Sequence, residues 1–324
     1  MRAIQVERHG GPEVLELREM PLPDEPSAGQ VTVRMIAAGV NFMDVAQQRG
    51  IYRREVPFTP GWEGSGIVES VGEGVSAFKA GDRVAFAHQP GAYAEAVHVD
   101  ASRLVQLPDD FTFEQGAAFL IQGLTAQYVI HEFRRLTAGE FVLVHAAAGG
   151  VGGLLVQWAR HLGAVVIGTV SSEAKARVAQ ELGAEHVILY TKKNFAAEVR
   201  RITGDRGADL ILDGVGRSTC QDNLAAVAVR GHIVLFGASS GPADPIAPYP
   251  LIQNSISLCG GSLLHLNRFR ERVTEVVSGI RAGWLKLSIG DVLPLEQAGK
   301  AHQMLEGRLS QGKLVLLVAK PPSS

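Results

Sequence analysis

Hydrophobic and polar positions follow two different patterns along the chain. From residue 1 to about residue 120, short alternating runs typical of β-strands are broken by clusters of Gly and Pro. Representative runs are 31–35, 66–71 and 82–86, and turn signals stand between them at 10–12 and 72–74. This first part predicts an irregular antiparallel β domain.

From about residue 140 the pattern becomes a strict alternation of apolar strands and helices. The expected strands are 141–145, 165–170, 186–190, 208–213, 232–237 and 256–259. The helices between them are expected to end at Gly163, Gly183, Gly204 and Gly231, and two of them to begin at the N-caps Ser172 and Asn194. Six strands joined by helical crossovers predict a doubly wound parallel sheet.

After about residue 264 the pattern changes again. It predicts two amphipathic helices, over 268–280 and around 295–305, and a strand over 313–318. We expect this last segment to return to the first domain, so that the nucleotide-binding unit is an insertion. The expected domains are therefore 1–123, 124–264 and 265–324, the first and last forming one catalytic domain.

Composition and charge narrow the class of protein. The chain has 324 residues, with 31 basic and 33 acidic side chains and a formal net charge of -2, which argues against a nucleic-acid partner. Cys220 and Cys259 are its only two cysteines, too few for a disulfide framework or a four-thiolate zinc site. The start lacks the apolar core of a signal peptide, and no apolar run approaches the roughly 20 residues of a membrane span. We expect a soluble, cytoplasmic protein.

A glycine-rich turn follows the strand 141–145 and precedes a helix. Its sequence 146–153 matches the dinucleotide fingerprint, with Ala147 in place of the first glycine. Gly149 would let the backbone approach a pyrophosphate, and the amides of Gly150 and Val151 would face it at the helix N-terminus. Gly152 would allow close packing of helix on strand. The turn predicts a dinucleotide site, with a plain structural turn as the alternative.

The end of the second strand bears on the choice of cofactor. An NAD site carries Asp or Glu there, whereas this strand ends in Ser171 and Ser172, with Lys175 in the next helical turn. Hydroxyls and an ammonium suit a 2′-phosphate, which favours NADPH over NADH. In the alternative interpretation Ser172 only caps the helix and Lys175 is solvated. Glu173 lies close by and is expected to point outward.

Four segments of the chain resemble the medium-chain dehydrogenase/reductase superfamily: 39–44, 60–66, 81–84 and 146–152. The resemblance spans essentially the whole chain and implies an α/β protein, with a GroES-like irregular β-barrel catalytic domain beside a Rossmann six-stranded parallel sheet. Zinc alcohol dehydrogenases of this superfamily carry Cys where Asn41 stands and His where Trp62 stands. Neither Asn nor an indole replaces those zinc ligands, so no metal site is predicted.

Segments 41–44, 50–52 and 146–152 resemble the quinone oxidoreductase branch in particular. Without a Lewis acid to polarise the acceptor, the acceptor must already be electrophilic, as quinones and conjugated enones are. The resemblance implies NADPH-dependent, zinc-independent reduction of a small-molecule quinone or enone. A 2-enoyl-thioester or enone reductase is the first alternative, and a non-catalytic NADPH-binding protein is the second.

The resemblance also implies two catalytic residues. Asn41 would lie near the nicotinamide and bond the cofactor or the acceptor oxygen, unless it is only a turn residue. Tyr52 would line the substrate pocket, where a phenol can stack on a ring or donate a proton. If Tyr52 serves only for packing, Arg53 and Arg54 beside it would form an exposed basic turn.

Further cofactor contacts are implied in the same way. The positions are Thr125 near the nicotinamide, Tyr190 near the adenosine, Phe236, Gly237 and Ser239 beside the nicotinamide, and Arg308 at the 2′-phosphate. Ligands bind at the carboxyl ends of parallel strands, which independently supports 236–239. His145 and Glu63 are expected to be structural. A homodimer is also expected, through the edge strand 256–259.

Overall fold

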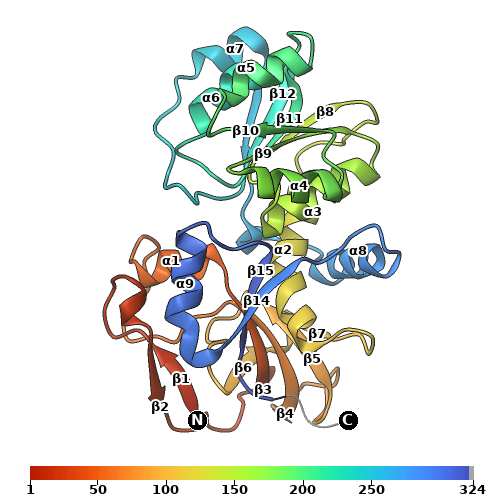
Figure 1. The fold of residues 1–324 in the computed structure, drawn as a ribbon. Coiled ribbons are helices and arrows are strands. Elements are labelled where there is room, and N and C mark those ends of the chain that lie inside the picture. The colour runs from red at the N-terminus through yellow and green to blue at the C-terminus, as the bar shows by residue number, and fades with distance from the viewer. Residues whose placement is uncertain (321–324) are drawn as a thin grey trace. The chain divides into compact units, whose positions relative to one another are not determined.

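The computed structural model describes residues 1–320, and the chain in it divides into two compact units (Figure 1). Unit 1 comprises Met1–Ile121 and the segment from Leu287 onward, and unit 2 comprises Gln122–Lys286. The nucleotide-binding unit is thus an insertion, as the sequence predicts. The last four residues of the expected return segment, 321–324, lie outside the described residues.

The return to unit 1 begins at Leu287, not at residue 265 as the sequence predicts. The difference is helix α8 (Phe269–Arg281), which packs on unit 2. Its buried Arg272 donates a hydrogen bond of 2.6 Å to Gln127, and a Cβ added at Gly123 would lie 2.7 Å from Val276. The amphipathic pattern predicted the helix correctly but could not show which unit its apolar face covers.

Unit 1 is built on a seven-stranded sheet of order β14-β15-β3-β4-β5-β7, with β6 also pairing β3. Its strands are β3 (Gln30–Gly39), β4 (Glu63–Val71), β5 (Arg83–Ala87), β6 (Ala96–Asp100), β7 (Leu104–Gln106), β14 (Ile289–Pro294) and β15 (Lys313–Leu317). All pairings are antiparallel except β14 with β15, and β1 (Arg2–Gln5) and β2 (Glu16–Glu19) form a separate hairpin. The expected runs 31–35, 66–71 and 82–86 lie in β3, β4 and β5, apart from residue 82.

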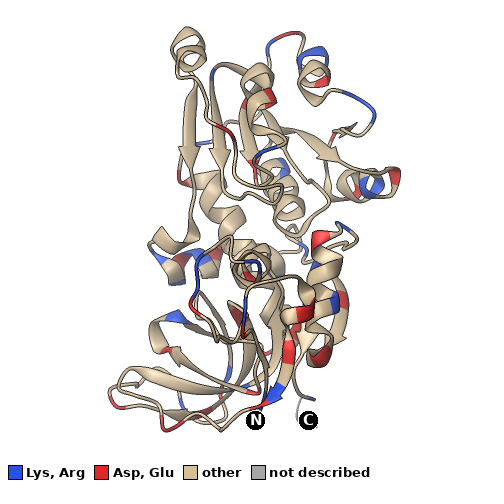
Figure 2. Cartoon of the chain, turned by 90° about the vertical axis from the view of Figure 1, so that its left-hand side faces the viewer, with Lys and Arg blue, Asp and Glu red and all other residues tan. Residues whose placement is uncertain are grey.

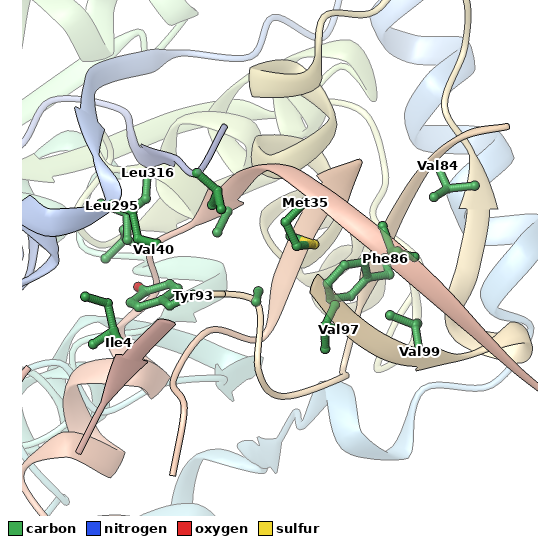
Figure 3. Close-up of a cluster of buried hydrophobic side chains, with 14 of the residues drawn as sticks. Ile4, Met35, Val40, Val84, Phe86, Tyr93, Val97, Val99, Leu295 and Leu316 are labelled. Atoms are coloured by element: carbon green, nitrogen blue, oxygen red, sulfur yellow. The ribbon is translucent and has the colours of Figure 1, made fainter. Parts of the chain in front are cut away.

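Apolar side chains of this sheet form the core of unit 1 (Figure 3). Met35, Phe86 and Leu316 are fully buried there, and the ring of Tyr93 lies beside Ile4 and Val40. Gly66 lets β4 approach β3 closely, because a Cβ at this position would lie 2.1 Å from the Arg34 carbonyl oxygen. The unit's helices are α1 (Phe42–Gln48), the start of α2 (Phe113–His131), α9 (Ala298–Glu306) and the 3₁₀ turns Pro12–Val14, Ala101–Arg103 and Leu295–Gln297.

Unit 2 contains a six-stranded, wholly parallel sheet of order β10-β9-β8-β11-β12-β13, which is the doubly wound order. Its strands are β8 (Phe141–Val144), β9 (Val165–Val170), β10 (His186–Leu189), β11 (Ala208–Asp213), β12 (Val227–Leu235) and β13 (Ser257–Gly260). The six expected strands are confirmed. β13 lies at the sheet edge, as expected, and its pairing with a second copy stays a prediction.

The helices of unit 2 begin and end largely where the sequence predicts. They are α3 (Gly150–His161), α4 (Glu173–Leu182), α5 (Phe195–Ile202), α6 (Cys220–Ala226), α7 (Tyr249–Asn254) and α8. Ser172 accepts a hydrogen bond from the Lys175 amide and Asn194 from the Ala197 amide, so both N-caps are confirmed. Gly183 closes α4 with φ 112.

Gly231 does not end a helix, contrary to the sequence prediction. Helix α6 stops at Ala226, and β12 starts at the next residue, so Gly231 lies within the strand. A Cβ at Gly231 would lie 2.6 Å from the Val227 side chain and 3.1 Å from the Ala208 carbonyl oxygen. The glycine therefore serves the close approach of β12 to β11 rather than a left-handed helix end.

Charged positions are mixed in sign along the ribbon of both units (Figure 2). This distribution agrees with the nearly balanced composition. No helix within residues 1–320 combines the length and the apolar character that crossing a bilayer requires.

Candidate cofactor and acceptor sites

The turn after β8 has the geometry of a phosphate-binding loop. Gly149 is the N-cap of α3 and extends the backbone at φ -85 and ψ 174. A Cβ at Gly152 would lie only 2.2 Å from the Ala146 carbonyl oxygen, so this position needs glycine for helix and strand to meet. Ala146 itself has φ 52, a left-handed conformation that turns the chain out of the strand. These contacts confirm the packing role predicted for Gly152.

A Cβ at Gly149 would meet little besides the backbone of its own turn. A Cβ built there would find one atom closer than 4 Å, the Ala146 carbonyl oxygen at 3.1 Å. The first N–H groups of a helix have no intrahelical acceptor, and here they belong to Gly150, Val151 and Gly152 at the start of α3. An uncovered backbone with free amides at a helix N-terminus fits a pyrophosphate. The residues present therefore fit a dinucleotide.

A buried polar network holds the carboxyl edge of the sheet beside this loop. His145 is 2% exposed, and its Nε2 lies 2.8 Å from Asn223 Oδ1 while its Nδ1 lies 2.9 Å from Thr169 Oγ1. Burial lowers the pKa of His145, so the ring is neutral, with Nε2 donating to Asn223. Asn223 in turn donates to Asp213 at 2.7 Å, and Asp213 also accepts from Thr219. His145 ties β8, β9 and α6 together, the structural role that the sequence predicts.

The candidate 2′-phosphate residues other than Arg308 lie where β9 ends and α4 begins. Ser171 accepts a hydrogen bond of 3.2 Å from Thr191 Oγ1, next to Tyr190, which is 39% exposed. Ser172 caps α4, and Lys175 lies in the first turn of that helix. Glu173 pairs with Lys192 at 2.9 Å, which balances the one carboxylate nearby. The sequence analysis missed Lys192, which adds an ammonium to this edge.

The segment 236–239 lies at the same edge of the sheet as the glycine loop. The Phe236 amide donates to the Asp213 carbonyl at 2.9 Å, and the Ser239 amide donates to Gly214 at 3.2 Å. Gly237 passes so close to Gly214 that a Cβ would lie 2.8 Å from its carbonyl oxygen. Segment 236–239 follows β12, which is separated from β8 by β11 alone, so it lies two strands along the same edge from the loop.

Two other candidate positions lie outside that edge. Thr125 is a buried residue of α2, and Arg308 follows α9 in unit 1 with φ 56. Their contacts with a cofactor stay predictions, as do those of the other candidate residues.

In unit 1 the candidate catalytic residue Asn41 is held by its own side chain. It is the N-cap of α1, and its backbone amide donates to Asp44 at 2.8 Å. Its Nδ2 donates to Glu63 at 3.0 Å, and its Oδ1 accepts from Lys313 Nζ at 2.7 Å. The amide expected to bond the cofactor or acceptor is thus already engaged inside the protein, and a direct contact with either stays a prediction.

Lys313 was not predicted by the sequence and is the central cation of this site. Its side chain is 1% exposed and bonds both Asn41 and Glu63, whose side chain is 0% exposed. Glu63 Oε2 also accepts from the Ile121 amide at 2.9 Å, near the middle of α2. Glu63 therefore has the structural role that the sequence predicts. Lys313 gave no signal, since a single lysine at a strand end is ordinarily solvated.

A second polar chain runs through the apolar core from Asp44. Tyr93 Oη lies 3.2 Å from Asp44 Oδ2 and 3.1 Å from His302 Nε2. His302 Nδ1 lies 2.5 Å from Gln48 Oε1, and Gln48 Nε2 donates to the Gly10 carbonyl at 3.1 Å. These side chains come from α1, the β5–β6 connection and α9, and Asp44, Gln48 and His302 are each 0% exposed. Their distance in sequence explains why sequence analysis missed the chain.

The donors and acceptors of this chain limit where its protons can lie. Gln48 Oε1 accepts from His302 Nδ1, so a neutral His302 must accept at Nε2 from Tyr93. Tyr93 has only one hydroxyl proton, so it cannot donate at once to His302 and to Asp44 Oδ2, which also accepts from the Asn41 amide. Burial raises the pKa of Asp44 to about 7, with Glu63 adding to the rise and Lys313 opposing it, and burial lowers the pKa of His302 to about 3. Asp44 therefore takes up its proton near neutral pH, whereas His302 stays neutral well below it.

The third feature of unit 1 is an exposed apolar segment around the other candidate catalytic residue. Tyr52 is 46% exposed, beside Ile51 at 58%, and Phe42 at the start of α1 is 43% exposed. The Tyr52 amide is anchored to the Ala46 carbonyl at 3.1 Å. An anchored backbone with an exposed phenol leaves the ring and hydroxyl available to a ligand.

Together the two units define a pyridine-nucleotide oxidoreductase with GroES-like and Rossmann domains. A family profile described as "Alcohol dehydrogenase GroES-like domain" matches residues 27–109, and one described as "Zinc-binding dehydrogenase" matches residues 150–278. In residues 1–320 no group of three or more His, Cys, Asp or Glu side chains has the arrangement of a metal site.

Relatives with assigned activities match along the entire chain. A quinone oxidoreductase of Pseudomonas aeruginosa is 40% identical over 98% of this chain and 99% of its own length. A 2-haloacrylate reductase of a Burkholderia species is 38% identical over 97% of this chain and 98% of its own length. The crystal structure of Escherichia coli quinone oxidoreductase complexed with NADPH has a TM-score of 0.94 and 37% identity, over 98% of this chain and 100% of that one. The chain belongs to the zinc-free quinone oxidoreductase branch of the medium-chain dehydrogenase/reductase superfamily.

Replacing Asp44 should make the free energy of unfolding depend on pH, because in the wild type the titrations of Asp44 and His302 offset each other. The raised pKa of Asp44 gives stability that is full below pH 3.8 and lost as the pH rises towards 7. The lowered pKa of His302 gives stability that is full above pH 6.5 and lost as the pH falls. Between pH 3.8 and pH 6.5 the two contributions oppose each other.

Asn at position 44 imitates the neutral acid and removes its titration. The free energy of unfolding of Asp44→Asn should therefore fall by about 1.4 kcal/mol per pH unit as the pH is lowered through this window, relative to the wild type. Urea unfolding measured at a series of pH values tests this, with the exposed Asp24→Asn as the control. Parallel pH profiles for Asp44→Asn and wild type would show that Asp44 is ionised in the folded protein.

Proposed function

We propose that this oxidoreductase uses NADPH to reduce small, conjugated, electrophilic acceptors, quinones first among them, without help from a metal ion. The observation that carries the proposal is the donor set of unit 1. Asn41 and Trp62 stand where zinc alcohol dehydrogenases have ligands, and the Asn41 amide is bonded to Lys313 and Glu63. The charges of Lys313 and Glu63 offset each other, so this interior is balanced without a bound cation.

NADPH is supported by the open backbone at Gly149 and by the basic, hydroxyl-lined end of β9. The edge of the sheet there has Ser171, Ser172 and Lys175, and its one nearby carboxylate, Glu173, is paired with Lys192. A mycobacterial relative with a TM-score of 0.94 and 42% identity was also solved in complex with NADPH. When bound, the cofactor supplies a hydride.

The protein's own groups would position the acceptor and manage its proton. The exposed ring of Tyr52 offers a face for stacking a flat acceptor, and its hydroxyl can donate to the oxygen that gains charge on reduction. Asn41, locked by Lys313 and Glu63, keeps the turn after β3 rigid. The second candidate function is reduction of a conjugated carbon–carbon double bond, favoured by the similarity to a 2-haloacrylate reductase.

A pair of glycine substitutions separates cofactor binding from folding. Gly149→Ala would place a methyl group over the loop, 3.1 Å from the Ala146 carbonyl oxygen, whereas Gly152→Ala would drive a Cβ to 2.2 Å from the same oxygen. We expect Gly149→Ala to weaken NADPH binding by roughly tenfold or more with little change in melting temperature. Gly152→Ala should instead lower the melting temperature. Titration of NADPH by fluorescence, alongside thermal unfolding of both variants, checks this, and unchanged NADPH affinity in Gly149→Ala would place the pyrophosphate elsewhere.

Reversing one charge tests the choice of cofactor. Lys175→Glu should weaken NADPH by about ten- to a hundredfold, the value of one charge-assisted hydrogen bond, and leave NADH nearly unchanged. Dissociation constants for both nucleotides measure the effect. Lys79→Glu, at an exposed lysine of unit 1, is the control for net charge. Equal losses for the two nucleotides would show that Lys175 does not contact the 2′-phosphate.

A panel of acceptors tests the proposed activity. The purified protein is given NADPH with a benzoquinone, a naphthoquinone, a crotonyl thioester or 2-chloroacrylate, and oxidation is followed by the loss of nicotinamide absorbance. We expect turnover of at least the quinones. Activity confined to the thioester or to chloroacrylate would overturn the quinone assignment in favour of double-bond reduction, and tight NADPH binding without turnover would favour a non-catalytic role.

A further inference from the structure

Arg54 is a half-buried cation whose hydrogen-bonding capacity is almost unused. It lies in the connection between α1 and β4, and its guanidinium carbon is 4.7 Å from the centre of the Phe58 ring and 5.9 Å from that of Trp62. Its one hydrogen bond is a long one, 3.3 Å to Gln47 Oε1, an oxygen that also accepts from Trp62 Nε1 at 2.8 Å. Four of the five guanidinium donors thus point to no protein acceptor within residues 1–320.

No acidic group of the described chain neutralises this cation. Arg54 forms no ion pair in residues 1–320, although its neighbour Asp44 is close enough to act on its charge. Burial lowers the pKa of Arg54, and the raised pKa of Asp44 weakens the opposing effect of that carboxyl group. A partly desolvated charge without a partner is unfavourable, so the site is suited to an anion supplied from outside.

The surroundings of Arg54 restrict which anion fits. Ile51, Tyr52 and Val56 flank it in sequence with exposed fractions of 58%, 46% and 40%. Exposed apolar and aromatic side chains in the same segment as the guanidinium suit a molecule with a charged end and a flat, unsaturated body. A fully hydrated anion such as phosphate would gain nothing from the apolar part.

We propose that Arg54 binds the carboxylate of an α,β-unsaturated acid and so makes such acids acceptors for this enzyme. The inference rests on the proposed function and names its substrate class. It adds a residue that no sequence pattern indicated, since Arg53 and Arg54 together resemble an exposed basic turn. The similarity to a 2-haloacrylate reductase is consistent with an acceptor that carries a carboxylate.

The chemistry explains why a cation is needed for this class. NADPH gives a hydride to the β-carbon, and the π bond breaks. The electron pair of the π bond moves onto the α-carbon and the carboxylate, and the α-carbon then takes a proton from water. NADP⁺ and the saturated acid are the products. The intermediate carries one more negative charge than the substrate on its carboxyl group. A guanidinium bound to those oxygens stabilises this charge where no metal ion is present to do so.

Matched variants and matched acceptors test the proposal. The holoenzyme with NADPH is assayed with 2-chloroacrylate and with 2-chloroacrylamide, which has nearly the same shape and no charge. Arg54→Gln should lower kcat/KM for 2-chloroacrylate by about ten- to a hundredfold and change that for the amide by less than about twofold. Arg54→Lys should restore part of the loss. Arg53→Gln, at the exposed neighbouring arginine, should leave both substrates unchanged.

Two outcomes would overturn the assignment of Arg54. Equal losses for the acid and the amide would mean that Arg54 only packs on Phe58 and Trp62, and the same loss in Arg53→Gln would reduce the effect to net charge. Turnover of quinones with no reduction of 2-chloroacrylate would also overturn it, while leaving the proposed function intact. Calorimetry with the saturated acid 2-chloropropionate decides independently of turnover, because its binding should disappear in Arg54→Gln and persist in Arg53→Gln.

Discussion

The buried pair of Lys313 and Glu63, with Asn41 bonded to both, is the interaction on which unit 1 depends. It joins β15, β4, the N-terminus of α1 and, through the Ile121 amide, helix α2. Removing one partner of a fully desolvated pair leaves the other charge uncompensated, at a cost of about 3–5 kcal/mol. The charges of Lys313 and Glu63 offset each other within this interior. The same hydrogen bonds thus join the elements of unit 1 and hold Asn41 in place.

In unit 2 the candidate phosphate-binding loop is formed by backbone groups and is held by hydrogen-bonded side chains. Its loop exposes backbone at Gly149 while Gly152 brings helix and strand together, and the network from His145 to Asp213 holds the strand ends that frame the loop. A neutral, hydrogen-bonded histidine stiffens this edge without adding charge beneath a dinucleotide. The recognition of phosphate then falls to backbone amides and to the side chains at the end of β9.

Whether the sequence predicted a feature depends on how far apart in the chain the residues that form it lie. Strands, N-caps and the glycine loop are local patterns and were predicted closely, whereas Gly231 and the boundary at residue 265 failed because tertiary packing decides them. Contacts between distant segments gave no signal, and so Lys313 and His302 were missed. Arg54 was interpreted as part of an exposed turn, because its stacking on Phe58 and Trp62 exists only in the fold.

The central claim is that hydride leaves NADPH for the acceptor with no metal ion taking part. Its most direct test is single-turnover oxidation of NADPH, and of NADPH deuterated at nicotinamide C4, by protein freed of metals with a chelator. The account predicts an undiminished rate and a primary deuterium isotope effect on that rate. A rate that collapses after chelation and returns with zinc would contradict it.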